Sequence, residues 1–188
     1  MRHFGVPSQS SGRSRSTGFT LIELLIVVAI IAIVAAIAVP GLLRARMSSN
    51  EASAMGSLRT VNSGQMSYSS SCAFGGYAIS LDDLVKPAAG SNQGFISPDL
   101  YKDAVSKSGY TLTLAKNGAA GVTDVGTGAA TCNASTNDPA SSYFAKADPV
   151  TPGASGSRYF ATDSRGTIFT SNAATIANPI PAGTSVVP

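Results

Sequence analysis

Residues 19–39 read FTLIELLIVVAIIAIVAAIAV, and this stretch decides the fold of the chain. Its 21 residues contain one charge, Glu23, and one further polar residue, Thr20. A helix of this length spans roughly 31 Å at 1.5 Å per residue, which matches the hydrocarbon thickness of a bilayer. The stretch therefore predicts a membrane-spanning helix rather than the core helix of a soluble domain.

The 18 residues before this stretch form a basic, Ser- and Gly-rich leader. They contain Arg2, Arg13 and Arg15 and no acidic residue, so we interpret them as a targeting segment. By the positive-inside rule these arginines place the N-terminus of the helix in the cytoplasm. The other 10 basic residues (13 − 3) balance the 10 acidic residues of the chain. We therefore expect no nucleic-acid-binding surface, which would need clustered Lys and Arg.

The apolar run ends at Pro40-Gly41, and an amphipathic pattern follows over about residues 42–68. Apolar positions recur there at spacings of three, four or seven residues, as on one face of a helix. They are Leu43, Met47, Ala54, Leu58, Val61 and Tyr68. Because proline lacks the backbone donor and clashes with the preceding turn, we predict a kink or a melted turn at Pro40 and Gly41.

The C-terminal region is rich in loops and short strands. Alternating or apolar segments predict strands at residues 110–114, 142–146, 158–162 and 167–170, with a hairpin turn at 163–166. We expect short helical turns at residues 80–85 and 97–105, the second with Ser97 as its N-cap. We expect residues 117–141 to form a surface loop. The predicted fold is α+β, a long N-terminal helix packed on a small antiparallel sheet of three or four strands.

These patterns predict four segments. Residues 1–18 are a cytoplasmic leader that is removed, 19–40 a transmembrane helix, 41–70 its amphipathic half, and 71–188 a periplasmic or extracellular globular domain; the family resemblance given below adds polymerisation to the role of residues 19–40. Both cysteines, Cys72 and Cys132, lie beyond the membrane segment, and an oxidising compartment favours a disulfide between them. Closing a loop of about 60 residues contributes about 4 kcal/mol on the chain-entropy estimate.

The residue inventory argues against an enzyme. With one histidine and two cysteines, no zinc cluster of four such ligands can form, and because His3 lies in the leader, a Ser-His-Asp or Cys-His site has no histidine base in the body of the chain. The acids after residue 120 are single and scattered, whereas calcium needs several convergent oxygens. We expect no catalytic residue, no metal site and no cofactor.

The run Gly18-Phe19-Thr20-Leu21-Ile22-Glu23, behind a basic leader and ahead of an apolar helix, resembles the prepilin signature of type IV pilins and type II secretion pseudopilins. The resemblance implies the pilin fold. It also implies that a prepilin peptidase cuts between Gly18 and Phe19 and methylates the Phe19 amine. In the filament, Glu23 would neutralise that amine, most often on a neighbouring subunit.

We accordingly expect a structural subunit of a type IV pilus-like filament, serving adhesion, motility or DNA uptake. Its partners would be further copies of itself, joined through the N-terminal helices, the prepilin peptidase, and an inner-membrane assembly platform with its ATPase. The subunit would sit in the bacterial inner membrane, in a single pass with its N-terminus cytoplasmic, before it joins a periplasmic or cell-surface filament. The alternative is a pseudopilin of a type II secretion system. A more remote alternative is a secreted soluble domain, because Ala36-Ile37-Ala38 satisfies an A-x-A signal-peptidase motif with cleavage after Ala38.

Overall fold

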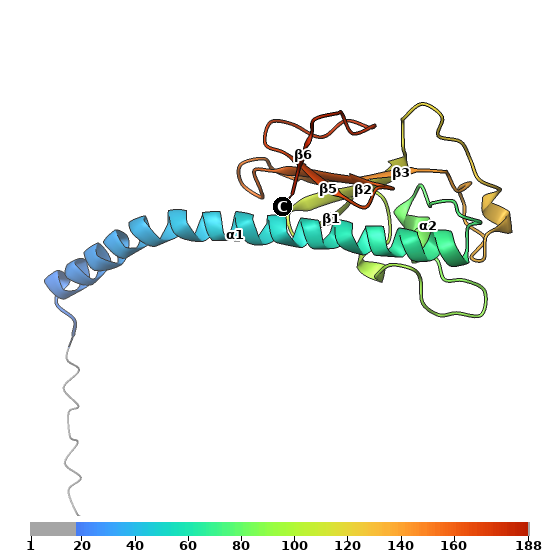
Figure 1. The fold of residues 1–188 in the computed structure, drawn as a ribbon. Helices are drawn as coiled ribbons and strands as arrows, with labels where there is room; N and C mark the ends of the chain where they lie inside the picture. The colour runs from blue at the N-terminus through green and yellow to red at the C-terminus, as the bar shows by residue number, and fades with distance from the viewer. Residues whose placement is uncertain (1–17, 188) are drawn as a thin grey trace, which may run out of the picture. The chain divides into compact units, whose positions relative to one another are not determined.

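A computed structural model of the chain describes residues 18–187. The predicted leader, apart from Gly18, therefore lies outside the described residues. The described residues fall into two compact units, one up to Gly41 and one from Leu42 onward. Helix α1 (Leu21–Ser71) supplies the main element of the first unit and the longest element of the second (Figure 1).

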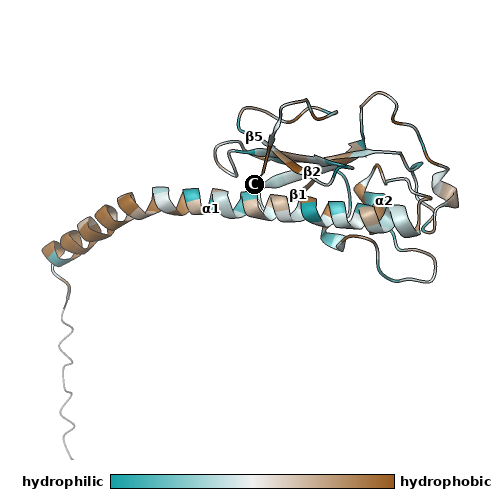
Figure 2. Cartoon of the chain, in the orientation of Figure 1, coloured by the Kyte–Doolittle hydropathy of each residue, from teal (hydrophilic) through white to brown (hydrophobic). Residues whose placement is uncertain are grey.

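The first unit contains the apolar part of α1. Its most apolar window of 18 residues has a mean hydropathy of 3.2, and none of that window is buried (Figure 2). By length and composition this helix can cross a membrane. Pro40 and Gly41 are both helical, so no turn is melted at that point, and the predicted kink stays a prediction.

In the second unit α1 buries one face from Glu51 to Tyr68. Ala54, Leu58, Val61 and Tyr68 lie on that face, as the apolar spacing predicts. Leu43 was placed on the same face, but it is exposed, because it precedes the part of the helix that the sheet covers.

The sheet is antiparallel and has six strands in the order β1-β2-β3-β4-β5-β6, rather than the predicted three or four. They are β1 (Val105–Lys107), β2 (Tyr110–Lys116), β3 (Tyr143–Pro149), β4 (Tyr159–Asp163), β5 (Ile168–Ser171) and β6 (Ser185–Val186). β2 to β5 are the four predicted strands, and β1 and β6 add a short strand at each edge. The fold is α+β, and within the second unit the C-terminal part of α1 lies along one face of the sheet (Figure 1).

The two faces of the sheet carry separate apolar layers. The face toward α1 contains Tyr110, Leu112 and Leu114 of β2, which alternate with half-buried threonines. The opposite face contains Phe144, Ala161 and Phe169, which Ile176 covers. The segment after β5 therefore closes the outer face of the sheet.

The region between helix and sheet differs in part from the prediction. α2 (Leu81–Val85) forms as expected, with the Ser80 hydroxyl accepting the Asp82 N–H at 3.2 Å. The second predicted turn shortens to η1 (Pro98–Leu100), and Val105 belongs to β1 because it pairs with Leu112. Ser97 stands at the N-cap of η1 without a capping side-chain bond.

The segment at 117–141 is more than a surface loop. It contains η2 (Gly128–Ala130) and buries polar side chains at Asn117, Thr131, Asn133 and Ser135. Small polar residues suggest solvent exposure, but the polar atoms of these four side chains have hydrogen-bond partners, so their burial is tolerated.

Candidate processing and assembly site

The start of α1 is built by a reciprocal pair of hydrogen bonds. The Glu23 N–H donates to Thr20 Oγ1 at 3.2 Å, and the Thr20 N–H donates to Glu23 Oε2 at 3.3 Å. The Thr20 hydroxyl donates to the same carboxylate oxygen at 3.0 Å. This is a capping box, in which a threonine and a glutamate three residues later satisfy two backbone donors that the first helical turn leaves unpaired.

The segment ahead of the box is open to solvent. Gly18, Phe19 and Thr20 are exposed and lie outside any helix, and Phe19 is 88% exposed. A Cβ built on Gly18 meets no atom within 4 Å among the described residues. The peptide bond between Gly18 and Phe19 is therefore accessible, and its backbone is free of helical hydrogen bonds that a protease would have to break.

The helix that follows exposes a continuous apolar surface. Leu21, Ile22, Leu25 and Ile33 are each at least 60% exposed, and no side chain of the described residues covers them. Such a surface needs a covering phase, which is either lipid or other apolar helices. The Glu23 carboxylate is the one charge on this surface, and an acid is favourable in the first turn because of the helix dipole.

Residues 13–39 match the family model of the prokaryotic N-terminal methylation motif, which is the prepilin-type motif of type IV pilins and pseudopilins. The chain carries a prepilin motif. The matched residues include Gly18, Phe19 and Glu23. No curated protein and no solved structure matches the chain.

The prepilin motif brings together three of the predicted site residues and adds one that the prediction did not include. Gly18, Phe19 and Glu23 lie within one short segment, and Thr20 bonds directly to Glu23. The Thr-x-x-Glu spacing was the signal for the capping box, since it is the sequence signature of that arrangement. Pro40 and Gly41 lie further along the same helix.

The two cysteines lie in the second unit and form the disulfide Cys72–Cys132, with their Cα atoms 4.7 Å apart and 60 residues between them in sequence. Cys72 follows the last residue of α1. The Cys132 N–H also donates to the Cys72 carbonyl at 3.2 Å, which reinforces the link between the helix end and residues 131–137.

A buried polar network holds that same segment in place. The Asp83 carboxylate accepts hydrogen bonds from the Thr136 N–H at 2.7 Å and from Asn137 Nδ2 at 2.8 Å. Asn133 Nδ2 donates to the carbonyls of Asp83 and Lys86 at 2.7 and 3.0 Å. Because each of these buried groups has partners, the network orders the segment.

The tyrosine at the centre of this region titrates above its ordinary range. Burial is the main cause that raises the pKa of Tyr68, while hydrogen bonds from Ser135 and Thr131 act in the opposite direction. The Tyr68 hydroxyl lies 2.5 Å from Ser135 Oγ. Tyr68 therefore stays protonated at neutral pH and acts as a structural hydrogen-bonding group.

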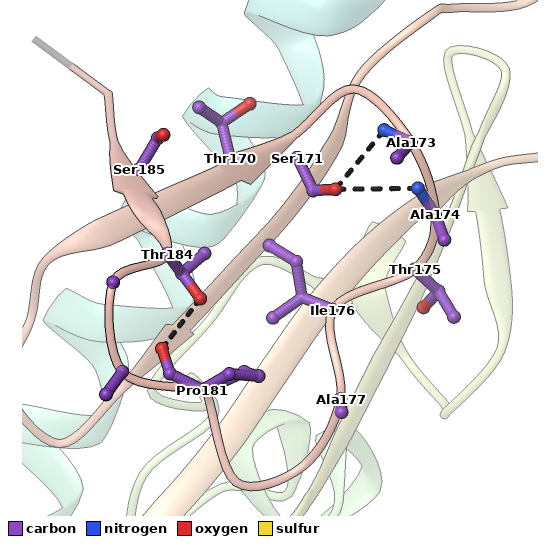
Figure 3. Close-up of a pocket in the computed structure, with 12 residues that line it drawn as sticks. Thr170, Ser171, Ala173, Ala174, Thr175, Ile176, Ala177, Pro181, Thr184 and Ser185 are labelled. Atoms are coloured by element: carbon purple, nitrogen blue, oxygen red, sulfur yellow. Dashed lines mark hydrogen bonds between the residues drawn. The ribbon is translucent and has the colours of Figure 1, made fainter.

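A hollow lies between β5, β6 and the segment that joins them (Figure 3). Its volume is about 450 Å³, and it is wide open to solvent. The twelve residues drawn there offer hydroxyls, methyl groups and backbone, and none of them is titratable (Figure 3). Among residues 18–187 no group of three His, Cys, Asp or Glu side chains is arranged to hold a metal ion.

Proposed function

We propose that this protein is a structural subunit of a type IV pilus-like filament, cleaved by a prepilin peptidase between Gly18 and Phe19 and polymerised through α1. The prepilin motif at residues 13–39 is the observation that carries the proposal. The exposed apolar surface of α1 supports it, because lipid can cover that surface before assembly and neighbouring helices can cover it afterwards.

The proposal assigns two successive roles to Glu23. Before cleavage its carboxylate closes the capping box with Thr20. Cleavage after Gly18 creates an α-ammonium on Phe19, four residues from Glu23 in sequence. A buried charge is costly unless it is paired, so an ammonium and a carboxylate in a helix bundle favour the arrangement that brings them together. The pair would set the register between subunits more than it would add affinity.

The mature N-terminus is the first test. We expect intact-mass spectrometry of membrane and filament fractions to give a chain that begins at Phe19 with one methyl group on its amine. A mature chain that begins at Val39 would mean signal-peptidase cleavage after Ala38 and a secreted domain, and it would refute the filament proposal.

A variant series separates the two roles of Glu23. Glutamine can still close a capping box but carries no charge, whereas alanine removes both the cap and the charge. We expect both E23Q and E23A to insert into the membrane and both to lose sheared filaments. If E23Q assembled at the wild-type level while E23A did not, the cap would be the functional feature and the charge pairing would be wrong.

The pseudopilin alternative shares the motif and the membrane helix, so it needs a separate assay. Deletion of the gene should abolish surface filaments and twitching while leaving exoprotein secretion intact. Normal pili with lost exoprotein secretion would assign the subunit to a type II secretion system.

A further inference from the structure

Seven of the ten basic side chains of the second unit are engaged within the chain. Five take part in ion pairs, at Lys107, Lys116, Lys146, Arg158 and Arg165. Lys86 donates to the Ala134 carbonyl, and the Lys102 ammonium lies 5.2 Å from the centre of the Tyr101 ring. Among the described residues, the basic side chains left without an ion pair, hydrogen bond or ring contact are three arginines of α1, namely Arg44, Arg46 and Arg59.

Arg59 differs from the other two by its position. Arg44 and Arg46 follow Val39 within seven residues, next to the predicted membrane segment, whereas Arg59 follows it by twenty. At 100° per residue, Arg59 points about 150° away from the centre of the face that α1 buries against the sheet. It is exposed. The Arg59 guanidinium, which has no ion-pair partner among the described residues, is therefore available to an acidic group of another molecule.

The helix surface around Arg59 carries small side chains and one exposed methionine. Its neighbours at spacings of three, four and seven residues include Ala52, Gly56 and Ser63, and the exposed Met66. A Cβ built on Gly56 meets no atom within 4 Å among the described residues, so nothing in the fold requires a glycine there. These short side chains let another protein surface approach the helix closely around the guanidinium.

The same unit carries exposed carboxylates without a cation. Asp82 of α2 accepts a hydrogen bond from the Ser80 hydroxyl at 3.2 Å, and Asp138 accepts one from the Gly128 N–H at 2.7 Å. Neither takes part in an ion pair among residues 18–187. The two lie on adjacent segments, because the neighbouring residues Asp83 and Asn137 are joined at 2.8 Å.

We propose that the outward face of α1 around Arg59 docks a second copy of this chain, with the Arg59 guanidinium meeting the exposed carboxylates of Asp82 and Asp138 in that copy. The inference rests on the proposed function, since a filament repeats one contact between copies at every subunit. Charge complementarity favours a second copy as the partner, because the same chain carries both an arginine and two carboxylates that take part in none of its own ion pairs. A guanidinium suits carboxylate partners, since it presents five donors in a rigid plane.

Zero-length cross-linking in native membranes tests the contact directly. A carbodiimide joins a lysine amine to a touching carboxylate with loss of water, and it does not acylate a guanidinium. We expect R59K to give a cross-linked dimer on a reducing gel, wild type to lack that dimer, and R59K/D82N/D138N to lose it. Absence of the dimer in R59K, or its persistence in the triple variant, would overturn the inference whether or not filaments form.

Charge reversal gives an independent measurement on filaments. R59E and D82R should each lower the sheared-filament yield about tenfold, because one attractive contact per subunit becomes repulsive. R59E/D82R should restore the yield, since the charges are exchanged. Wild-type yield in either single variant, or no recovery in the double variant, would overturn the inference.

Two controls keep the outcomes separate. R59E should retain the disulfide and the wild-type amount of protein in membranes, since the Arg59 side chain is exposed and makes no ion pair within residues 18–187. If R59E instead weakened flotation of the full chain with phosphatidylglycerol vesicles, the arginine would bind lipid phosphate and the docking inference would fall. An unprocessed N-terminus, or a wild-type strain without filaments, would count against the proposed function. The contact between copies would still be tested by the cross-linking experiment, which does not depend on filaments.

Discussion

Two glycines of α1 differ in what a methyl group would meet, so the same substitution should have opposite effects at the two positions. A Cβ on Gly64 would lie 2.3 Å from Ile96 Cγ2 and 2.9 Å from the Phe95 carbonyl oxygen. A Cβ on Gly56 would meet nothing within 4 Å. Alanine favours an interior helical position over glycine by about 0.5–1 kcal/mol.

For G56A we expect the full gain, a rise in the free energy of unfolding of about 0.5–1 kcal/mol. For G64A the overlap involves a backbone carbonyl, which no change of rotamer can move away. Overpacking of this kind costs about 1–3 kcal/mol, so the net loss should be about 1–2 kcal/mol after the helical gain. With a shift of about 3 °C per kcal/mol for a domain of this size, G56A should melt about 2–3 °C higher and G64A about 3–6 °C lower than wild type.

The assay is thermal unfolding of the full-length protein in detergent, followed by the near-ultraviolet circular dichroism of its tyrosines. Detergent keeps the chains apart, so contacts between copies do not enter the comparison. A melting temperature for G64A at or above wild type would show that the approach of residues 95 and 96 to the helix is wrong. A lower value for G56A would show that this position is packed.

Three further predictions concern the second unit. C72S/C132S should lower the free energy of unfolding by about 4 kcal/mol, measured by thermal unfolding, because the disulfide closes a loop of about 60 residues, and a loss below about 1 kcal/mol would contradict this. Burial acts to raise the pKa of Glu51, but hydrogen bonds from Ser157 and Arg158 outweigh it and leave that pKa below its ordinary value of 4.5. The ionised Glu51 carboxylate therefore contributes its full stabilisation of the fold above pH 4.5, and this contribution is lost as the pH falls through the lowered pKa. E51Q should accordingly reduce the fall of the free energy of unfolding at acidic pH. Burial, with the charge of Glu51, raises the pKa of Tyr110 to about 12, so stability should fall between pH 10 and 12 and Y110F should remove part of that fall in an alkaline titration.

The sequence predicted the elements that have a strong period. The membrane-type helix, the apolar face of residues 54–68 and strands β2 to β5 follow from alternation or from helical spacing. β1 and β6 have three and two residues, too few for any period to show. They exist because a neighbouring strand offers an edge to pair with, and a single chain segment does not reveal that.

The sequence predicted the candidate site where that site depends on local residue spacing. It did not predict the features that depend on long-range contacts. Gly18, Phe19 and Glu23 follow from the motif, and the Thr20 cap follows from a separation of three residues. The carboxylate of Asp83 bonds to residues more than fifty positions later, and composition alone suggested an exposed loop there. Burial of polar groups depends on partners, and the partners become visible only in the folded chain.

The order of the sheet has a consequence for biosynthesis. Each strand pairs with the one that precedes it in the chain, from β1 to β6, so the sheet can grow strand by strand as the polypeptide is made and never has to insert a late strand between two early ones. Except at the long connection between β2 and β3, pairing of sequential neighbours keeps the sequence separation of contacting residues small, which favours fast folding. β6 is then the last of the described strands to pair, and just after it the Val187 N–H donates to the Ile168 carbonyl at 2.9 Å. A nascent chain stalled before residue 185 would leave the β5 edge unpaired and the outer apolar layer only partly secured.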